Sequence, residues 1–332
     1  MSKLKQRAFV YGLALFYGWL TILRILFEWC RRPSVKFWER KTRDEPPACL
    51  NDSALGQHSY VHLRDVKLHY VENGDRSKPL MLCVHGFPEF WYSWRHQLKE
   101  FSKDYWVVAI DMRGYGDSDK PTGLEPYGID LLVDDLRELI VALGREQCVL
   151  VAHDWGGIIA WHFVEKCPEM VQRFIIMDAP YMRLYAKYVM SHFKQFLRAW
   201  YTFFFLLPFL PEFTLLRYDM NFIEEMLGKD KANKNSKITD QDIEAYKYTF
   251  GKPGALTPPI NYYRSNLWRR SKKGKRTDLG ENTPHGLLIF GQNDAYLDQE
   301  LVRLSAEMVK NLQTFIVPDA NHFVQQDQPE KY

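Results

Sequence analysis

Hydrophobic residues follow three different patterns along this chain of 332 residues. The first pattern is a nearly continuous apolar segment, Ala8 to Cys30, which only Arg24 and Glu28 interrupt. As a helix, this segment is about long enough to span a bilayer. It shows no small-residue cleavage site of the kind that ends a signal peptide. We therefore predict a membrane anchor at residues 1–30, with residues 8–30 in contact with the lipid bilayer; a helix lying in the interface and a cleaved signal peptide are the alternatives.

The orientation of this anchor is open. The basic residues on its two sides are balanced, so that the positive-inside rule barely decides between the two orientations: Lys3, Lys5, Arg7, Arg31, Arg32 and Lys36. Asn51-Asp52-Ser53 is a glycosylation sequon just after the anchor. A glycan on Asn51 would place the following domain in a lumen, although such triplets also occur by chance.

The second pattern consists of short apolar runs. After a polar linker at residues 31–55, Tyr60 to Leu63 and Leu68 to Val71 read as the strands of a hairpin. Further strand-like runs follow, separated by helix-like stretches such as Ile129 to Leu143: Leu80 to Val84, Trp106 to Ile110, Cys148 to Ala152 and Phe174 to Met177. This alternation predicts a mostly parallel sheet flanked by helices, whose first part is residues 56–180.

The third pattern is an aromatic-rich, helix-like region at residues 181–280 that contains no strand pattern. Strand-like runs return at Gly286 to Phe290 and at Thr314 to Val317. Residues 281–332 therefore read as the second part of the same sheet domain, and residues 181–280 as a helical lid inserted above it.

Composition and charge exclude several partners and cofactors. The net charge of +3 is small for this length and the basic residues are mostly dispersed, which gives no reason to expect nucleic acid. The five cysteines form no CxxC or Cys/His cluster. They predict neither a zinc site nor a disulfide framework, and we expect no metal and no cofactor.

A strand, turn and helix pattern centres on Asp154. The apolar run ending at Ala152 is followed by His153-Asp154-Trp155-Gly156-Gly157 and by a helix-like segment, Ile158 to Glu165. In α/β-hydrolases this turn has the form small-x-nucleophile-x-small, because a strained backbone exposes the nucleophile. The chain contains no G-x-S-x-G, so a serine hydrolase lacks its nucleophile. A carboxylate in this position favours displacement at an sp³ carbon, which forms an alkyl ester when an epoxide opens or a halide leaves.

Two further residues follow late strands in the order that this fold requires. Asp294 comes after the run that ends at Phe290, and His322 after the one that ends at Val317. We predict that His322 is the general base that activates water, and that Asp294 orients His322 and stabilises its charged form.

Ester hydrolysis passes through an oxyanion, which needs hydrogen-bond donors. The backbone amides of Phe87 and Trp155 are the candidates for this oxyanion hole, because His85-Gly86-Phe87-Pro88 follows a predicted strand. Pro88 has no amide hydrogen and cannot donate.

With these motifs the chain resembles the epoxide hydrolases of the α/β-hydrolase fold, and in particular their membrane-anchored branch. The resemblance runs from about Ala48 to the end of the chain and rests on these segments: HGFPEFWYSWRHQ, DMRGYGDSDKP, HDWGG, NYYR, PPACL, PFLPEF and QQDQP. It implies conversion of a small apolar epoxide, from lipid metabolism or xenobiotic, and water to a vicinal diol. It also implies a microsomal protein of the endoplasmic reticulum with a single type II pass.

The resemblance also assigns two lid tyrosines, which hydrogen-bond the epoxide oxygen and protonate the leaving alkoxide. Tyr263, in NYYR, matches one of them by motif. Tyr201 is the best fit for the other, with a packing role as the alternative, and Trp155 is a further candidate for the pocket wall.

Two other functions stay open. A haloalkane or haloacid dehalogenase shares the fold, the aspartate and the histidine but does not need the tyrosines. An inactive membrane-tethered binding protein can keep the fold without turnover. The resemblance leads us to expect a further helix after the histidine loop, of which only Gln328 to Tyr332 is present, so that apolar surface is left uncovered.

Overall fold

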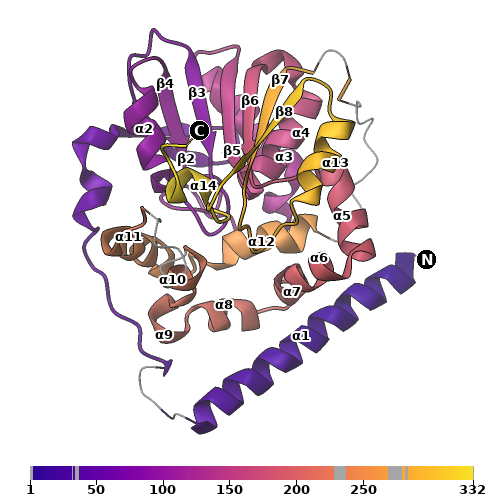
Figure 1. The fold of residues 1–332 in the computed structure, drawn as a ribbon. Helices are drawn as coiled ribbons and strands as arrows, with labels where there is room; N and C mark the ends of the chain where they lie inside the picture. The colour runs from indigo at the N-terminus through magenta and orange to yellow at the C-terminus, as the bar shows by residue number, and fades with distance from the viewer. Residues whose placement is uncertain are drawn as a thin grey trace.

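The computed structural model describes residues 3–31, 33, 37–227, 237–267, 279–280 and 283–331. In this part of the chain an eight-stranded sheet has the order β1-β2-β4-β3-β5-β6-β7-β8 (Figure 1). Its strands are β1 (Gln57–His62), β2 (Lys67–Asn73), β3 (Leu80–Val84), β4 (Trp106–Ile110), β5 (Cys148–His153), β6 (Val171–Met177), β7 (His285–Gly291) and β8 (Leu312–Val317). The pairs β1–β2 and β2–β4 are antiparallel, and the pairs from β4 to β8 are parallel.

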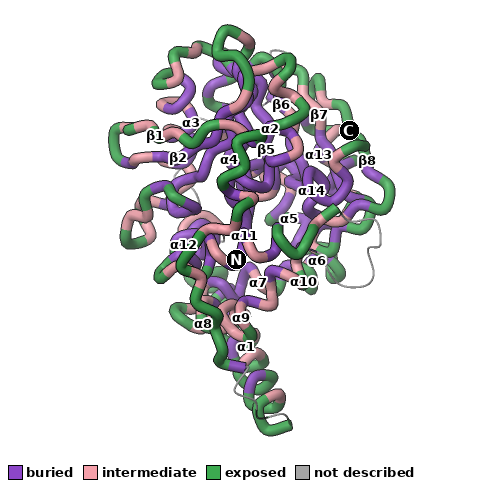
Figure 2. The backbone as a smooth tube through the Cα atoms, turned by 90° about the vertical axis from the view of Figure 1, so that its left-hand side faces the viewer, coloured by how far each residue is buried: buried purple, intermediate pink, exposed green. Residues whose placement is uncertain are grey.

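Every predicted strand is confirmed. The central strands β3, β4 and β5 are almost wholly apolar because both of their faces are covered, whereas most residues of β8 are exposed. All residues of β3, β4 and β5 are buried. The flanking helices are α2 (Arg95–Phe101), α3 (Ile129–Ala142), α4 (Trp155–Lys166), α13 (Glu300–Met308) and α14 (Val324–Asp327). Figure 2 shows the buried strands at the centre of the molecule.

Several boundaries differ from the sequence prediction. Helix α4 begins at Trp155 rather than at Ile158, because the turn passes into the helix directly after Asp154. Strand β6 begins at Val171, three residues earlier than predicted, since Val171 pairs with Cys148 across the sheet. Pairing with a neighbouring strand, which local apolarity does not reveal, sets these ends.

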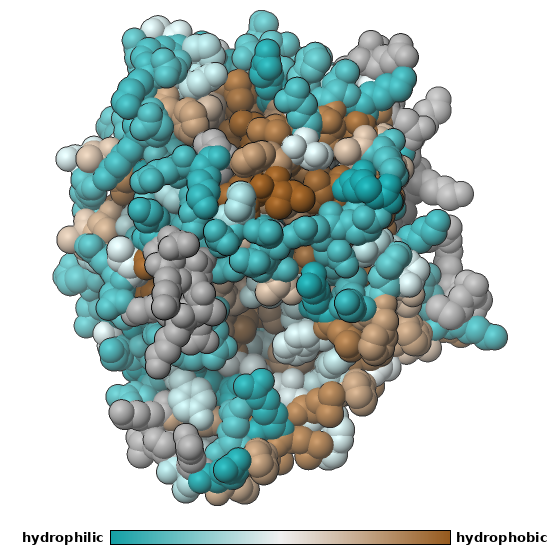
Figure 3. Space-filling model, in the orientation of Figure 1, coloured by the Kyte–Doolittle hydropathy of each residue, from teal (hydrophilic) through white to brown (hydrophobic). Residues whose placement is uncertain are grey.

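An apolar groove of about 340 Å³ crosses one face of the sheet. Side chains of β3, β5, β6 and β7 line it together with Phe101 of α2; Phe174, Ile175 and Leu287 are among them. Figure 3 shows hydrophobic residues gathered in the upper centre of this view.

The segment between β6 and β7 forms the predicted lid, and only helices occur in its described residues. They are α5 (Met182–Ser191), α6 (Phe193–Arg198), α7 (Trp200–Phe204), α8 (Leu210–Leu215), α9 (Arg217–Met220), α10 (Phe222–Met226), α11 (Asp240–Gly251) and α12 (Thr257–Asn266). At the start of the chain, α1 (Lys3–Arg31) lies along this lid (Figure 1). Short 3-10 helices, Ala48–Asn51 and Ser53–Leu55, lead from the linker into β1.

Candidate active site

The turn between β5 and α4 holds Asp154 in a strained conformation, with φ at 48° and ψ at −116°. A non-glycine residue adopts a positive φ only where its surroundings enforce it. The glycines allow this turn, because a Cβ atom on Gly156 would lie 2.2 Å from the carbonyl oxygen of Val84. The tight packing of the backbone around Asp154 therefore explains the predicted turn, in which the Asp154 side chain faces the pocket.

His322 lies between two carboxylates. Its Nε2 atom is 3.5 Å from Oδ2 of Asp154, and its Nδ1 atom is 2.8 Å from Oδ2 of Asp294. Nδ1–H therefore donates to Asp294, which leaves Nε2 directed at Asp154. The structure brings together the three residues that the sequence singled out, although they come from loops after β5, β7 and β8.

Asp294 is held by its own loop. Its Oδ1 atom accepts hydrogen bonds from the backbone amides of Tyr296 at 2.7 Å and Leu297 at 2.9 Å. Burial opposes ionisation of Asp294, but the charge and hydrogen bond of His322 and these two amides outweigh it and lower its pKa. The carboxylate is thus an ionised partner for the imidazole.

Burial and neighbouring charges also act in opposite directions on the pKa values of Asp154 and His322. Burial opposes the ionisation of Asp154, yet its pKa lies below the ordinary value because of the hydrogen bond and charge of His322. Burial opposes the protonation of His322, but Asp294 and Asp154 together raise its pKa well above the ordinary value. The resting site is therefore an ion pair of an aspartate and an imidazolium.

The amide of Phe87 donates to Oδ1 of Asp154 at 2.8 Å. Trp155 is the first residue of α4, and a helix offers no acceptor for the amide of its first residue. The Phe87 amide thus lies against one oxygen of the Asp154 carboxyl group, and the Trp155 amide belongs to the helix start that directly follows Asp154.

The two predicted tyrosines meet above Asp154. Tyr263 of α12 and Tyr201 of α7 line one pocket with Asp154, Trp155 and His322. Their ring centroids lie 6.0 Å apart. Burial, followed by the charge or hydroxyl of neighbouring groups, raises the pKa of both phenols well above 10, so both keep their protons at neutral pH.

Sequence reasoning missed other residues of this pocket. Tyr185 of α5 and Tyr296 also line it, and the ring of Tyr296 packs against His322 with centroids 5.0 Å apart. With so many tyrosines in the chain, no local signal separates these two from packing residues. Only the fold selects them.

A second buried histidine also escaped notice. Nδ1 of His153 lies 2.7 Å from Glu89, and its Nε2 atom lies 2.8 Å from the backbone oxygen of His322. All three residues are buried. His153 thereby holds the loop that carries His322, and its position directly before Asp154 was the available signal.

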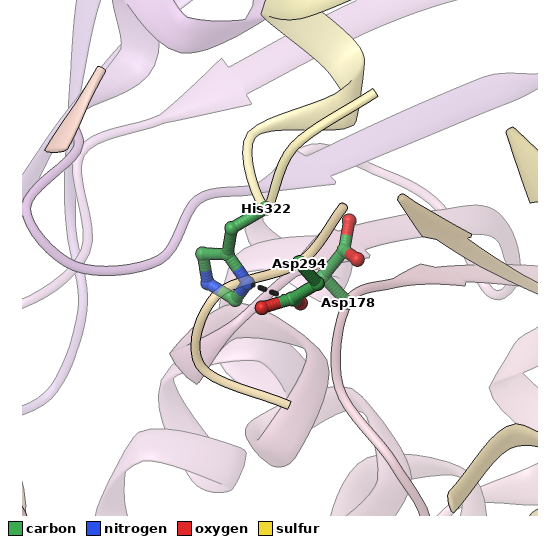
Figure 4. Close-up of side chains that lie close together, drawn as sticks. All are labelled: Asp178, Asp294 and His322. Carbon is green, nitrogen blue, oxygen red and sulfur yellow. Dashed lines mark hydrogen bonds and ion pairs between the residues drawn. The ribbon is translucent and has the colours of Figure 1, made fainter. Parts of the chain in front are cut away.

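Asp178 is the most prominent missed residue. It directly follows β6 and is fully buried beside the two residues drawn with it in Figure 4, Asp294 and His322. One ligand atom from each of the three lies within 4.8 Å of the others, a spacing that also suits a metal ion. His322 and Asp294 already bond to each other here, so the cluster reads as part of the charged site.

Comparison with known proteins adds the following. A family model for the α/β-hydrolase fold matches residues 79–329. Mouse epoxide hydrolase 4 is 40% identical over 327 residues, which cover 97% of this chain and 89% of its own length. Epoxide hydrolase 3 of Xenopus tropicalis is 42% identical over 295 residues, covering 87% of this chain and 79% of its own. A crystal structure of Bacillus megaterium epoxide hydrolase with an inhibitor is 32% identical, has a TM-score of 0.74, and covers 82% of this chain and 96% of the bacterial chain.

Proposed function

Since this chain belongs to the epoxide hydrolases of the α/β-hydrolase fold, we propose that it converts an apolar epoxide and water to a vicinal diol through an alkyl ester of Asp154. The observation that carries this mechanism is the pocket in which Asp154, His322 and two protonated lid tyrosines meet. A dehalogenase would use the same aspartate and histidine but would have no task for the phenols.

In the first step, Oδ2 of Asp154 attacks an epoxide carbon. This oxygen is free of the Phe87 amide, which binds Oδ1. The new bond joins Oδ2 to the carbon, and the bond from that carbon to the epoxide oxygen breaks. Tyr263 and Tyr201 hydrogen-bond that oxygen, and one of them gives it a proton as it becomes a hydroxyl.

In the second step, water attacks the carboxyl carbon of the ester. His322 accepts a proton from the water through Nε2 and is stabilised by Asp294 on its other side. Oδ1 becomes the oxyanion and receives the amides of Phe87 and Trp155. The bond between the carboxyl carbon and Oδ2 then breaks, and the departing oxygen takes up the second proton of the water. The diol leaves, the water oxygen stays on Asp154, and His322 is left protonated.

Ester formation itself switches His322 to a base. In the free enzyme, the negative charge of Asp154 helps to raise the pKa of His322. The ester is neutral, so this contribution disappears when the intermediate forms. The imidazolium can then give its proton to the phenolate left by the first step, and the neutral imidazole accepts one from water.

The pocket favours an apolar substrate, lipid or xenobiotic, because aromatic and aliphatic side chains form most of its wall, among them Met182, Tyr185 and Leu267. A Bacillus megaterium relative, 32% identical with a TM-score of 0.73, has been crystallised with a naphthyloxy-propanediol as its product. That product is an apolar aryl diol and supports this class of substrate.

Membrane attachment through α1 is part of the proposal. Within the described residues, Leu4–Arg31 is the helix long and apolar enough to cross a membrane, by length and composition. We propose the endoplasmic reticulum as its location, as the family resemblance implies.

Turnover in H₂¹⁸O tests the mechanism. Under multiple turnover of a lipid epoxide, we expect ¹⁸O both in the diol and in the peptide that carries Asp154. The Asp154→Asn variant, matched in size, should form no diol at first. Diol formation without label in the Asp154 peptide would contradict an ester intermediate, and equal turnover by both proteins would remove the aspartate from the mechanism.

A further inference from the structure

Helix α1 has one face that packs against the lid. Val10, Ala14 and Ile25 are buried, and their spacing places them on one side of the helix. Gly18 lies on the same side, and a Cβ atom there would come within 2.4 Å of Leu207 in the lid. Close packing thus extends over most of the helix, whereas its other faces are exposed and apolar.

The end of α1 is joined to the lid by charge as well as by packing. Arg217 of α9 lies 3.0 Å from Glu28, and its guanidinium stands 5.1 Å from the ring centroid of Phe37. Trp38 continues this contact, with ring centroids 5.3 Å from Phe213 and 5.8 Å from Trp29. The ion pair of Glu28 with Arg217 exists only while α1 lies alongside the lid.

Exposed apolar side chains gather on this side of the molecule. Among the described residues, 20 of the 25 exposed large hydrophobic side chains belong to α1, to Trp38 or to the lid. In the lid they are Met190, Phe193, Leu197, Trp200, Phe209, Phe213 and Tyr218, with Phe209 84% and Phe193 74% exposed. Figure 3 shows hydrophobic residues along the lower right margin, where Figure 1 places α1. A surface of this extent in contact with water is a sign of a partner.

Helix α7 connects this surface with the pocket. Trp200 and Phe203 contact Tyr17 of α1, with ring centroids 6.0 and 6.4 Å apart. Tyr201, between them in sequence, lines the pocket with Asp154. A single short helix therefore separates α1 from the reacting groups.

From these observations we propose that α1 lies in the interface of a bilayer and, together with the exposed apolar side chains of the lid, forms one lipid-contacting surface through which apolar epoxides enter. The inference rests on the proposed membrane attachment, and it places α1 in the interface of the bilayer instead of across it. A spanning α1 would extend across about 30 Å of hydrocarbon. It would then either leave the lid or draw charged lid residues such as Arg217 into the bilayer, where a charged side chain is strongly unfavourable.

Topology in intact microsomes tests the position of α1. The full chain carries a short epitope tag at each end and is treated with protease from outside. We expect both tags to be protected or both to be cleaved, since an interfacial helix leaves both ends on one side. Protection of one tag only would establish a crossing helix and overturn the inference.

Two glycine variants test substrate entry. Gly18→Leu should separate α1 from the lid, whereas Gly12→Leu adds the same side chain where no atom lies within 4 Å. With an epoxide dissolved in phosphatidylcholine vesicles, we expect Gly18→Leu to lower kcat/KM several-fold and Gly12→Leu to leave it unchanged. With a water-soluble epoxide, neither should change kcat/KM by more than about two-fold.

The outcomes separate this inference from the proposed function. Equal effects of both variants on the vesicle-borne substrate would overturn the entry route while turnover persists. Absence of turnover with every epoxide, in the unsubstituted chain, would instead contradict the proposed function.

A second inference rests on Asp178. Its Oδ1 atom accepts a hydrogen bond from the amide of Gly291 at 2.9 Å, whereas Oδ2 is buried and meets no donor among the described residues. Oδ2 is an acceptor beside Asp294, which is also an acceptor. Two buried carboxylates in one cluster repel each other, which favours a proton on one of them.

We infer that Asp178 is a positioning residue: its carboxyl group keeps a proton and donates it to Asp294, which fixes the carboxylate that orients His322. The effects of Asp294 and His322 on the pKa of Asp178 agree with a protonated Asp178. Burial and then the charge of Asp294 raise the pKa of Asp178 well above its ordinary value, against a smaller opposite effect of His322. One negative charge, not two, then faces the imidazolium.

Asparagine and alanine variants distinguish a protonated Asp178 from an ionised Asp178 carboxylate. Asp178→Asn keeps an acceptor for Gly291 and a donor for Asp294, so we expect its ester hydrolysis rate to stay within about three-fold of the original. Asp178→Ala keeps neither and should lower that rate ten-fold or more. The infrared band of a buried protonated carboxyl group should vanish in Asp178→Asn.

Equal loss of activity in both variants, or no protonated carboxyl band before substitution, would overturn the inference. Full activity of Asp178→Ala would do the same. The asparagine variant keeps the test informative even if the alanine variant fails to fold.

Discussion

In the proposed mechanism, two single residues give the two half-reactions different pH dependences. The lowered pKa of Asp154 keeps its carboxylate ionised into the acid range, so ester formation continues there. His322 responds differently, because in the ester the charge of Asp294 still favours its protonated form, whereas it must be neutral to accept a proton from water. Acid therefore slows hydrolysis of the ester before it slows its formation.

We accordingly predict that the alkyl ester accumulates as the pH falls from about 8 to about 5.5, on either side of the ordinary histidine pKa. The measurement is the mass of the Asp154 peptide after rapid quenching during turnover. A fraction of ester that is constant or smaller at acid pH would show that His322 does not limit hydrolysis.

The hydroxyl groups of Tyr263 and Tyr201 give a second prediction for single residues. Tyr263→Phe removes a proton donor and should slow ester formation by about 10²-fold, the usual contribution of a general acid. Tyr201→Phe should cost less if Tyr263 alone can still protonate the oxygen, and the double variant should cost most. Tyr248→Phe, in α11 and not among the residues that line the pocket, serves as the control. Pre-steady-state ester formation is the measurement, and unchanged rates in the double variant would return Tyr201 to a packing role.

At the scale of elements, the strands could be predicted because buried parallel strands are continuous apolar runs. The turn at Asp154 could also be predicted, since small residues at fixed positions around Asp154 reflect a local steric need. The first residues of helices and the ends of strands were harder to predict from the sequence. Val171 joins β6 only because Cys148 lies opposite, a contact over 23 residues of chain that no short pattern encodes.

The glycine after the nucleophile gives an element-scale prediction. Gly156→Ala places a Cβ atom 2.2 Å from a backbone oxygen of β3, so that α4 must move from the sheet. We expect a loss of about 1 to 3 kcal/mol in unfolding free energy, as for other overpacked sites, together with lower activity. Gly128→Ala is the control, because its Cβ atom would meet its nearest neighbour at an ordinary 3.4 Å. Equal thermal unfolding of both variants would contradict the steric account.

At the scale of the whole molecule, the linker ties distant parts of the lid together. Arg43 lies 2.7 Å from Asp219 of α9 and 2.9 Å from Glu244 of α11, and its own side chain is only 10% exposed. Its hydrogen bond with Asp219 raises its pKa. A cation of the linker thus joins two lid helices that are separate in sequence.

Arg43→Met should therefore destabilise the chain by about 1 to 3 kcal/mol, since two acidic groups lose a charged partner. Thermal unfolding of the detergent-solubilised chain measures this as a fall in Tm of several degrees. Arg64→Met removes a pair whose arginine side chain is 62% exposed and should change little. A Tm that is equal in the two variants would assign the contact no role in holding the lid.

The sequence by itself determined the fold class, the order of strands along the chain and the helical insertion, and it singled out Asp154, Asp294 and His322 as the candidate catalytic residues. Each depends on local patterns: apolar runs, small residues at a turn, and polar residues directly after strands. Tertiary structure decided what depends on distance between remote segments. It placed Asp178 against Asp294, because β6 and β7 are neighbours in the sheet, and it laid α1 along the lid through contacts such as Glu28 with Arg217. Burial and proximity create the charge coupling of the active site and the exposed apolar surface of α1 and the lid, and neither is a property of any one segment.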